Sequence, residues 1–252
     1  MIDLADVGAE FDRIADVYDD TRPALLEAEI GIITNTLKMH ECRSVLEIGV
    51  GTGRVSKPLR EASFDVFGVD LSTRMIAKAK QKGLDKLVIA DTNSLPFMND
   101  AFDAAILVHV VHLLPNPPMA FAEIARVVRR NLVAIVRRPT DRIDDCEQIR
   151  RLIRSRLSKS SDSRPENRWK KETELLQSFP PFERKPFCDR TTEMTAEEVI
   201  SILKKRAYRF TFNISEPDLH KITDEITYLM KGKKISRRRS EEIVVWRADQ
   251  FA

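Results

Sequence analysis

Apolar residues recur every three or four positions near the start of the chain and form short uninterrupted runs after residue 43. The first spacing predicts one amphipathic helix over residues 4–18 and a second that Thr21 caps and that continues to Leu37. The short runs are rich in β-branched residues and predict strands at Ser44–Ile48, Asp65–Val69, Lys86–Ala90, Ala104–Val108 and Leu132–Val136. Because most of these runs are apolar on both faces, they predict a parallel sheet with helices on both sides.

Helical spacing between these strands completes a doubly wound α/β pattern, whose ligand crevice lies beyond the carboxyl ends of the strands. These helices are expected at Arg54–Ala62, Ser72–Lys82 and Pro118–Arg130, with Ser72 as an N-cap and Gly83 as a stop. Further helices are expected at Arg142–Ser163, Arg168–Phe179, Thr195–Arg206 and Asp218–Met230.

Two more strands are expected near the end of the chain, at Phe182–Arg190 and Glu242–Trp246. Pro186 lacks a backbone N–H, so the first of them is restricted to the edge of the sheet. Thr195 and Glu198 have the spacing of a capping box at the start of their helix.

Composition excludes several classes of protein. The chain has 42 Lys+Arg and 39 Asp+Glu, a net charge of +3, so its total charge does not favour nucleic acid or an anionic membrane as a partner. Cys42, Cys146 and Cys188 lie far apart, and this spacing suggests neither a metal site nor a disulfide framework. The amino terminus lacks the pattern of a signal peptide, and the most apolar stretch, Ala104–Leu114, is shorter than the ~20 residues that cross a bilayer. We expect a soluble cytoplasmic protein.

Three of the eight glycines, Gly49, Gly51 and Gly53, fall within five residues directly after the first strand. Glycine permits positive φ and close approach of a ligand, and a strand–loop–helix unit directs free N–H groups at that point. We therefore expect a nucleotide-like cofactor here, although a tight turn that packs helix on strand would use glycines too. The spacing differs from the dinucleotide fingerprint GxGxxG, and Glu47 inside the strand suits a cationic ligand better than a pyrophosphate.

The segment Val45–Gly53, VLEIGVGTG, resembles the first motif of the class I S-adenosylmethionine-dependent methyltransferases. Val66–Ser72, Ala90–Phe97 and Phe102–His109 are similar to the next three motifs, in the same order. The resemblance covers residues 8 to about 138. It implies a Rossmann-like, seven-stranded, mostly parallel sheet with an antiparallel last strand and helical cap insertions.

The resemblance also assigns cofactor-binding roles to the residues that match its motifs. It implies that Asp70 accepts hydrogen bonds from both ribose hydroxyls, with Leu71 beside it. It implies that Asp91 takes the adenine amino group while Thr92 borders the ring. His109 would lie beside the methionine part of the cofactor.

Two flanking segments extend the resemblance. Phe11–Asp19 resembles the amino-terminal helix of the subgroup that methylates small molecules, including ubiquinone-biosynthesis-type enzymes, in which Tyr18 would fold over the cofactor as part of a lid. Glu123–Val128 matches a run that normally ends in a Pro-Gly-Gly turn. This chain has Arg129-Arg130-Asn131 instead, so Asn131 is expected to take any left-handed position there.

Methyl transfer from a sulfonium depends mainly on alignment, which contributes ~7–11 kcal/mol, so a general base is optional. His109 at the mouth of the fourth strand is the candidate catalytic base, and the alternative is a hydrogen-bonded histidine at a strand end. Asn116-Pro117-Pro118 is similar to a signature of adenine amino methylation, but it lies some seven residues beyond the strand tip and is typical of a helix start.

We therefore expect one methyltransferase domain that transfers a methyl group from S-adenosylmethionine to a small-molecule acceptor by in-line displacement and leaves S-adenosylhomocysteine. Three alternatives stay open: an RNA or protein methyltransferase, a non-catalytic cofactor-binding protein, and a nicotinamide dehydrogenase. The first would use the basic clusters around Arg150 and in Lys231–Arg239, the second of which is expected to be a solvated loop. No motif in the expected cap helices identifies the acceptor. The expected organisation of residues 1–252 is a lid at 1–40, a cofactor-binding core at 41–139, cap helices at 140–181 and 192–240, and last strands at 182–190 and 241–248.

Overall fold

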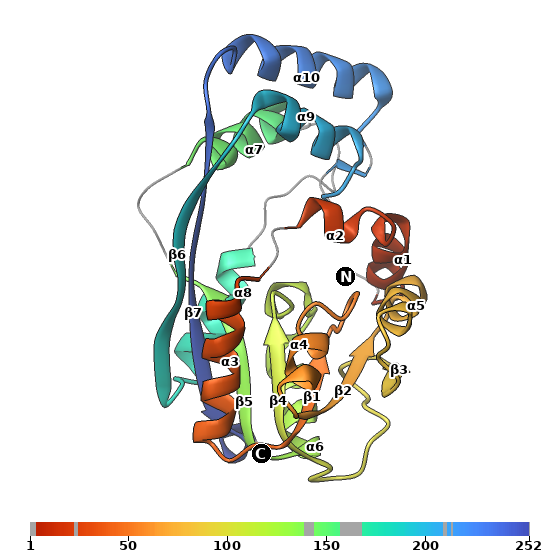
Figure 1. The fold of residues 1–252 in the computed structure, drawn as a ribbon, viewed down its shortest axis with the longest axis vertical. Coiled ribbons are helices and arrows are strands. Elements are labelled where there is room, and N and C mark those ends of the chain that lie inside the picture. Colours follow the sequence, from red (N-terminus) through yellow and green to blue (C-terminus); the bar gives the residue numbers. More distant parts are fainter. Residues whose placement is uncertain are drawn as a thin grey trace. The chain divides into compact units, whose positions relative to one another are not determined.

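A seven-stranded sheet with the order β3-β2-β1-β4-β5-β7-β6 organises the protein (Figure 1). The first five strands pair in parallel, and β7 runs antiparallel to β5. The strands are β1 (Ser44–Ile48), β2 (Asp65–Asp70), β3 (Leu87–Ile89), β4 (Phe102–Val108), β5 (Val128–Arg137), β6 (Glu183–Met194) and β7 (Ile235–Arg247). The predicted doubly wound fold, its antiparallel last strand and the edge position of the strand that contains Pro186 are confirmed.

The computed structural model describes residues 4–22, 25–138, 144–156, 168–208, 211–212 and 214–251. The chain divides into two compact units. Unit 1 takes Met1–Arg137, Asn167–Phe187 and Glu241–Ala252, and unit 2 takes Arg138–Glu166 and Cys188–Ser240. Whether unit 2 acts as the cap over an acceptor stays a prediction.

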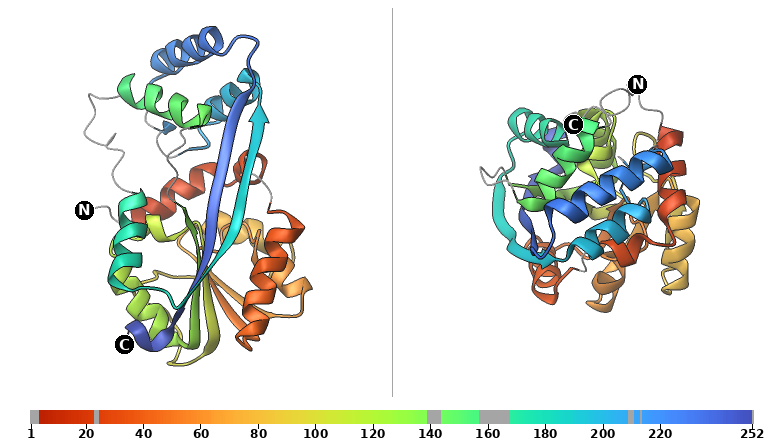
Figure 2. Two further views of the ribbon diagram at one scale, coloured as in Figure 1. Left: turned by 90° about the vertical axis from the view of Figure 1, so that its left-hand side faces the viewer. Right: turned by 90° about the horizontal axis from the view of Figure 1, so that it is seen from above.

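In unit 1, helices cover both faces of the sheet, as the doubly apolar strands require. Helices α3, α4 and α5 lie on one face and α6 and α8 on the other (Figure 2, left). The elements of this unit other than strands are α1 (Leu4–Ile14), α2 (Tyr18–Thr21), α3 (Glu27–Met39), α4 (Ser56–Glu61), α5 (Thr73–Gln81), η1 (Val111–Leu113), α6 (Pro117–Val127), α8 (Arg168–Ser178) and η3 (Ala248–Phe251).

The core of unit 1 forms between β4, β5, β7 and the helices α6 and α8. Trp246 is fully buried there, its ring contacts Phe121 edge-on at 5.3 Å, and its indole N–H donates to the Phe179 carbonyl at 2.6 Å. An aromatic ring of this size contributes much of the buried apolar area, and its one polar atom has a partner. This packing fixes β7 beside β5 and holds the ends of the parallel strands in place.

The amino-terminal helices differ from the prediction. Thr21 does not cap the second long helix; it is the last residue of α2, and its hydroxyl donates to the carbonyl of Val17 at 2.8 Å. Helix α3 begins later, at Glu27, where the Glu29 carboxylate accepts the N–H of Leu26 at 3.0 Å. A Thr hydroxyl bonds equally well to a carbonyl one turn before it, and that local bond replaces the expected cap.

The segment before β5 also differs from the prediction. Helix α6 ends at Val127 and β5 begins at the next residue, so no turn needs a left-handed residue. Asn131 lies inside β5 opposite Ala104, is buried, and does not have positive φ. The departure from the Pro-Gly-Gly pattern is thus accommodated by a direct transition from helix to strand.

Unit 2 is built from α7 (Asp145–Arg156), α9 (Ala196–Lys204), α10 (Glu216–Leu229) and parts of β6 and β7. Its apolar core joins the three helices. The predicted capping box is confirmed, because Thr195 and Glu198 exchange hydrogen bonds at 3.2 and 2.8 Å. The ends of the predicted helix Arg142–Ser163 lie outside the described residues.

The basic segment of unit 2 was wrongly expected to be a loop. Strand β7 begins at Ile235, so most of Lys231–Arg239 is strand, and the apolar Ile235 is fully buried in the core of the unit. In the described part of the chain, no helix combines the length and apolar character needed to cross a membrane.

Candidate functional site

The glycine loop after β1 is tied to the end of β2 through Asp70. The Gly51 N–H donates to Asp70 Oδ2 at 2.7 Å, and the Ser72 N–H donates to Oδ1 at 2.9 Å. Burial raises the pKa of Asp70, and these backbone N–H groups oppose that effect. The Leu71 N–H also bonds to this carboxylate. A carboxylate has two acceptor oxygens with about four lone pairs and no donor, so Asp70 keeps acceptor capacity toward the hydroxyls of a vicinal diol.

The three loop glycines have positive φ, +67° at Gly49, +54° at Gly51 and +78° at Gly53, but they meet different surroundings. A Cβ at Gly49 would overlap the side chain of Val110, and one at Gly53 would overlap Leu84. A Cβ at Gly51 would have no neighbour closer than the Gly49 carbonyl oxygen at 4.0 Å. Gly49 and Gly53 thus serve close packing, while Gly51 borders open space beside Asp70.

Glu47 lies in β1 behind this loop and is 3% exposed. The Ser56 hydroxyl at the start of α4 donates to its Oε2. Burial raises the pKa of Glu47 to about 8, with a smaller contribution from the charge of Asp70, although the bonds from Ser56 oppose the shift. At neutral pH the Glu47 carboxyl is therefore mainly uncharged unless a cation lies beside it, and it ties β1 to α4.

The raised pKa of Glu47 predicts a pH-dependent contribution to stability. The folded state favours the protonated carboxyl, so the stabilisation is complete below pH ~4.5 and is lost as the pH rises through about 8. At ~1.4 kcal/mol for each pH unit between 4.5 and about 8, the loss is on the order of 5 kcal/mol. Urea unfolding of wild type and Glu47→Gln should therefore show a stability difference that favours Gln increasingly from pH 5 to pH 8. The control Glu61→Gln, on the exposed end of α4, should show a constant difference; a constant difference for Glu47→Gln would contradict the assignment.

Asp91 and Thr92 follow β3, whose Ile89 pairs with Asp70 of β2. This register places Asp91 just beyond the end of the strand beside Asp70. The Asp91 carboxylate accepts the N–H of Asn93 at 2.8 Å, which fixes the turn, and Thr92 is buried. Leu71, which follows Asp70, is half-buried.

Tyr18 begins α2 and contacts Phe11 edge-on at 6.3 Å, while the Arg22 guanidinium lies 5.1 Å from the centre of its ring. Sequence reasoning missed the acids that attach this segment to the loop. Asp19 accepts the Thr52 hydroxyl at 2.6 Å, and Asp12 accepts the Ser72 hydroxyl at 2.5 Å. The helical spacing places these acids on the polar face of an amphipathic helix and does not indicate what they bind. A run of acids in a chain whose cofactor loop contains Thr and Ser is the sequence signal that could have found these contacts.

His109 directly follows β4, which pairs with β1 so that Leu107 lies opposite Ile48. It therefore lies next to the glycine loop, and it has a φ of +58°, which is uncommon outside glycine. Its Nε2 lies 3.8 Å from Oε1 of Glu241, a buried residue of β7 that sequence reasoning did not single out. The predicted site residues Gly51, Asp70 and His109 thus come together at the carboxyl ends of adjacent strands.

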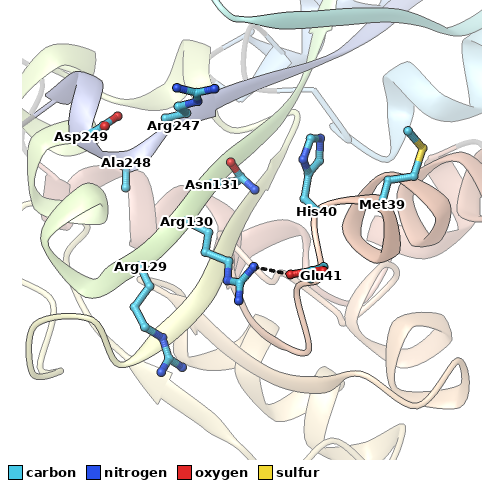
Figure 3. Close-up of a pocket in the computed structure, with 9 residues that line it drawn as sticks. All are labelled: Met39, His40, Glu41, Arg129, Arg130, Asn131, Arg247, Ala248 and Asp249. Carbon is cyan, nitrogen blue, oxygen red and sulfur yellow. Dashed lines mark hydrogen bonds and ion pairs between the residues drawn. The ribbon is translucent and has the colours of Figure 1, made fainter.

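A cavity of about 410 Å³ lies elsewhere, at the amino ends of the parallel strands (Figure 3). Two of the arginines that line the cavity form ion pairs with acids. Arg130 binds Glu41 at 3.0 Å, Arg129 binds Asp103 at 3.2 Å, and the side chains of Arg129 and Arg247 point to opposite sides of the cavity. This end is not where doubly wound folds bind ligands. The lining residues are Met39, His40, Glu41, Arg129, Arg130, Asn131, Arg247, Ala248 and Asp249.

Residues 46–136 match the family model described as a methyltransferase domain. This segment of the chain is similar to a methyltransferase domain. It includes the glycine loop, Asp70, Asp91 and His109, so the resemblance inferred from the motifs is confirmed.

Individual relatives agree with the family. A demethylmenaquinone methyltransferase of Renibacterium salmoninarum is 29% identical over 129 residues, which are 49% of this chain and 54% of that enzyme. The chain spans about half the length of the curated relatives it matches.

Two solved structures share the fold. A methyltransferase of Thermotoga maritima, described as S-adenosylmethionine-dependent and a possible histamine N-methyltransferase, has a TM-score of 0.54 and 18% identity, covering 95% of this chain and 99% of its own. A phosphoethanolamine N-methyltransferase of Haemonchus contortus, bound to S-adenosylhomocysteine, has a TM-score of 0.53 and 16% identity, covering 96% of this chain and 58% of its own.

Proposed function

We propose that the protein transfers a methyl group from S-adenosylmethionine to a small-molecule acceptor. The observation that carries the proposal is the Asp70 carboxylate, which two backbone N–H groups orient and which retains acceptor capacity toward a diol. The open space at Gly51 lies beside it. A sugar with two adjacent hydroxyls and a chain extending over the loop fits this arrangement.

Different residues would contact different parts of the cofactor. Asp70 would hold the ribose, with Leu71 beside it, while Asp91 and Thr92 would border the adenine. Gly51 would face the methionine part. When bound, the cofactor supplies a methyl group on a positively charged sulfur. The chain's own contribution is to align that group with the acceptor, and alignment is the largest effect available for such a reaction.

The amino-terminal segment would complete the pocket, with Tyr18 as the residue that covers the cofactor. Its attachment through Asp12 and Asp19 to the loop and to α5 supports this role. Asp19 bonds to Thr52, which adjoins Gly51, and Asp12 bonds to Ser72, whose N–H donates to Asp70. Glu47 supports the loop from behind rather than from the ligand side.

A small acceptor agrees with the relatives that act on small molecules, and a cytoplasmic location stays a prediction. The basic residues of unit 2 support RNA or protein as acceptor less well, because many of them are paired with acids. Arg150 and Arg154 both contact Glu147, at 3.0 and 3.3 Å, and Arg238 binds Asp189 at 3.1 Å. Paired cations release less free energy when they meet phosphate groups.

Calorimetry and thermal unfolding with S-adenosylmethionine, S-adenosylhomocysteine and NADH test the proposal. A ligand at 100 times its Kd stabilises the folded protein by ~2.7 kcal/mol, so the two sulfur compounds should raise the Tm and NADH should not. Methylation of at least one compound in a panel of small acceptors should follow. Stabilisation by NADH alone would favour a dehydrogenase, and cofactor binding without methylation of any acceptor would favour a binding protein.

A further inference from the structure

Two histidine–glutamate pairs lie just beyond the carboxyl end of β4. His109 Nε2 is 3.8 Å from Glu241 Oε1, and His112 Nδ1 is 3.6 Å from Glu172 Oε1. Both acids are buried, with Glu241 2% and Glu172 4% exposed. They come from different elements, β7 and α8, and meet histidines that are three residues apart.

Burial of these histidine–glutamate pairs is unfavourable for the stability of the fold. A buried carboxylate is unfavourable unless it is paired or hydrogen-bonded, and packing alone is better served by an apolar residue. His109 also has a left-handed backbone, with a φ of +58°, which costs about 1–3 kcal/mol in a residue other than glycine. Such features concentrate at functional sites.

The position of the two histidines separates their roles. His109 lies next to the glycine loop, its side chain is 34% exposed, and its neighbour Val110 packs against Gly49. The His112 side chain is 12% exposed, and its partner Glu172 also accepts the Arg137 N–H at 3.2 Å, which ties α8 to the end of β5. The second pair therefore joins structural elements, and the first pair can reach a ligand.

We propose that His109 and Glu241 take a proton from the methyl acceptor, and that the acceptor is therefore a group that gives up a proton, such as a hydroxyl, thiol or N–H. This inference rests on the proposed function. As the new carbon–acceptor bond forms and the methyl–sulfur bond breaks, the acceptor proton passes to Nδ1 of His109. Glu241, facing Nε2, stabilises the resulting imidazolium, and the proton then leaves to solvent.

In this arrangement His109 is the catalytic residue and Glu241 is a positioning residue. Other charges are present on the neighbouring elements: Arg137 lies opposite Glu241 at the end of β5, and Lys171 and Glu172 lie on α8, which packs on η1. Glu241 is the acid that directly faces His109, so removal of its charge should act on His109 most strongly.

The first test needs no acceptor. The chain has four histidines, so NMR can follow each imidazole as the pH is varied in the protein without added ligand. Glu241→Gln should lower the pH at which His109 titrates, because the acid 3.8 Å from its Nε2 favours the charged imidazolium. The matched control is Glu183→Gln, which removes the acid from the His40–Glu183 contact of 3.0 Å at the other end of the sheet and should leave the His109 titration unchanged. An unchanged His109 titration in Glu241→Gln would overturn the proposal.

The second test measures turnover at saturating cofactor. His109→Gly should fold normally, because glycine adopts a φ of +58° without penalty. Its kcat should fall about 100-fold, and added imidazole should restore it in part. The double variant with Glu241→Gln should not be restored by imidazole, since the acid that orients the added base is gone. The control His40→Asn should keep the wild-type kcat, and wild-type turnover by His109→Gly would overturn the base assignment.

The acceptor panel separates this inference from the proposed function. Failure of wild type to bind S-adenosylmethionine would count against the proposed function. The titration of His109 in wild type and in Glu241→Gln would still show whether Glu241 acts on His109. A wild type that methylates only thioethers or tertiary amines, which have no proton to lose, would retain the proposed function and overturn the acceptor class.

Discussion

Gly51→Val should abolish detectable binding of S-adenosylmethionine while the protein stays folded. Gly51 has a φ of +54°, and a Cβ there would point into open space beside Asp70. The branched side chain would fill the space into which the methionine part is expected to extend. The backbone penalty of a left-handed, non-glycine residue is about 1–2 kcal/mol, which a domain of this size tolerates. Calorimetry should show at least a 100-fold loss of affinity, with a Tm only a few degrees lower.

The neighbouring glycines provide matched controls with the opposite pattern. Gly49→Ala and Gly53→Ala place a Cβ against Val110 and Leu84, so each should destabilise the fold more than Gly51→Ala does. Gly51→Ala should mainly weaken cofactor binding. Normal affinity in Gly51→Val would remove the loop from the proposed site, and unfolding of Gly51→Ala would show that this glycine serves packing like the other two.

The sheet could be predicted from the sequence because its central strands are buried on both faces. Most positions of Ser44–Ile48 and of Phe102–Val108 are apolar, including consecutive positions that point to opposite faces of the sheet. Neither segment has the three- and four-residue spacing of apolar residues that would predict a helix instead. The sequence pattern predicted only the second part of strand β7, Glu242–Trp246. Its first residues, Ile235–Arg239, are mostly basic and carry no strand pattern, so their pairing depends on tertiary context.

Local capping was predictable only where one geometry was available to the residue. Ser72 caps α5 as expected, since its hydroxyl accepts the Met75 N–H at 3.0 Å. Thr21 could have bonded forward or backward, and the structure uses the backward bond to Val17. The sequence contains no information that distinguishes the two outcomes without the preceding helix in place.

The candidate site was predictable where its residues belong to one continuous motif. Gly51 and Asp70 flank strands that are neighbours in the sheet, so their proximity follows from the order of the strands. Glu241 could not be found in this way, because it reaches His109 from the antiparallel last strand, and its neighbour Glu242 offers an equivalent acid on the opposite face. The face on which each acid lies depends on the register between β5 and β7, which no sequence motif records.

Asp70→Ala should weaken binding of S-adenosylmethionine by roughly 100- to 10,000-fold. The carboxylate can accept one hydrogen bond from each ribose hydroxyl, and a bond to a charged group contributes about 1.5–3 kcal/mol, with 1.4 kcal/mol corresponding to tenfold in affinity. The free energy of unfolding should change little, because removal of this buried carboxylate relieves the desolvation that raises its pKa while it loses the bonds to Gly51 and Ser72. Titration calorimetry with S-adenosylhomocysteine measures the affinity, and urea unfolding measures the stability.

The control for this variant is Asp65→Ala, at the opposite end of the same strand, which loses only a surface ion pair with Lys86 and should bind the cofactor normally. The raised pKa of Asp70 adds a second, independent signature. Because the ionised carboxylate is the form that accepts two hydroxyl bonds, wild-type affinity should fall as the pH is lowered, beginning at a higher pH than an ordinary aspartate would give. This loss should be absent from Asp70→Ala, whose weak binding has no such carboxylate to protonate. Equal affinities of wild type and Asp70→Ala, or an identical pH dependence in both, would show that β2 does not hold the ribose.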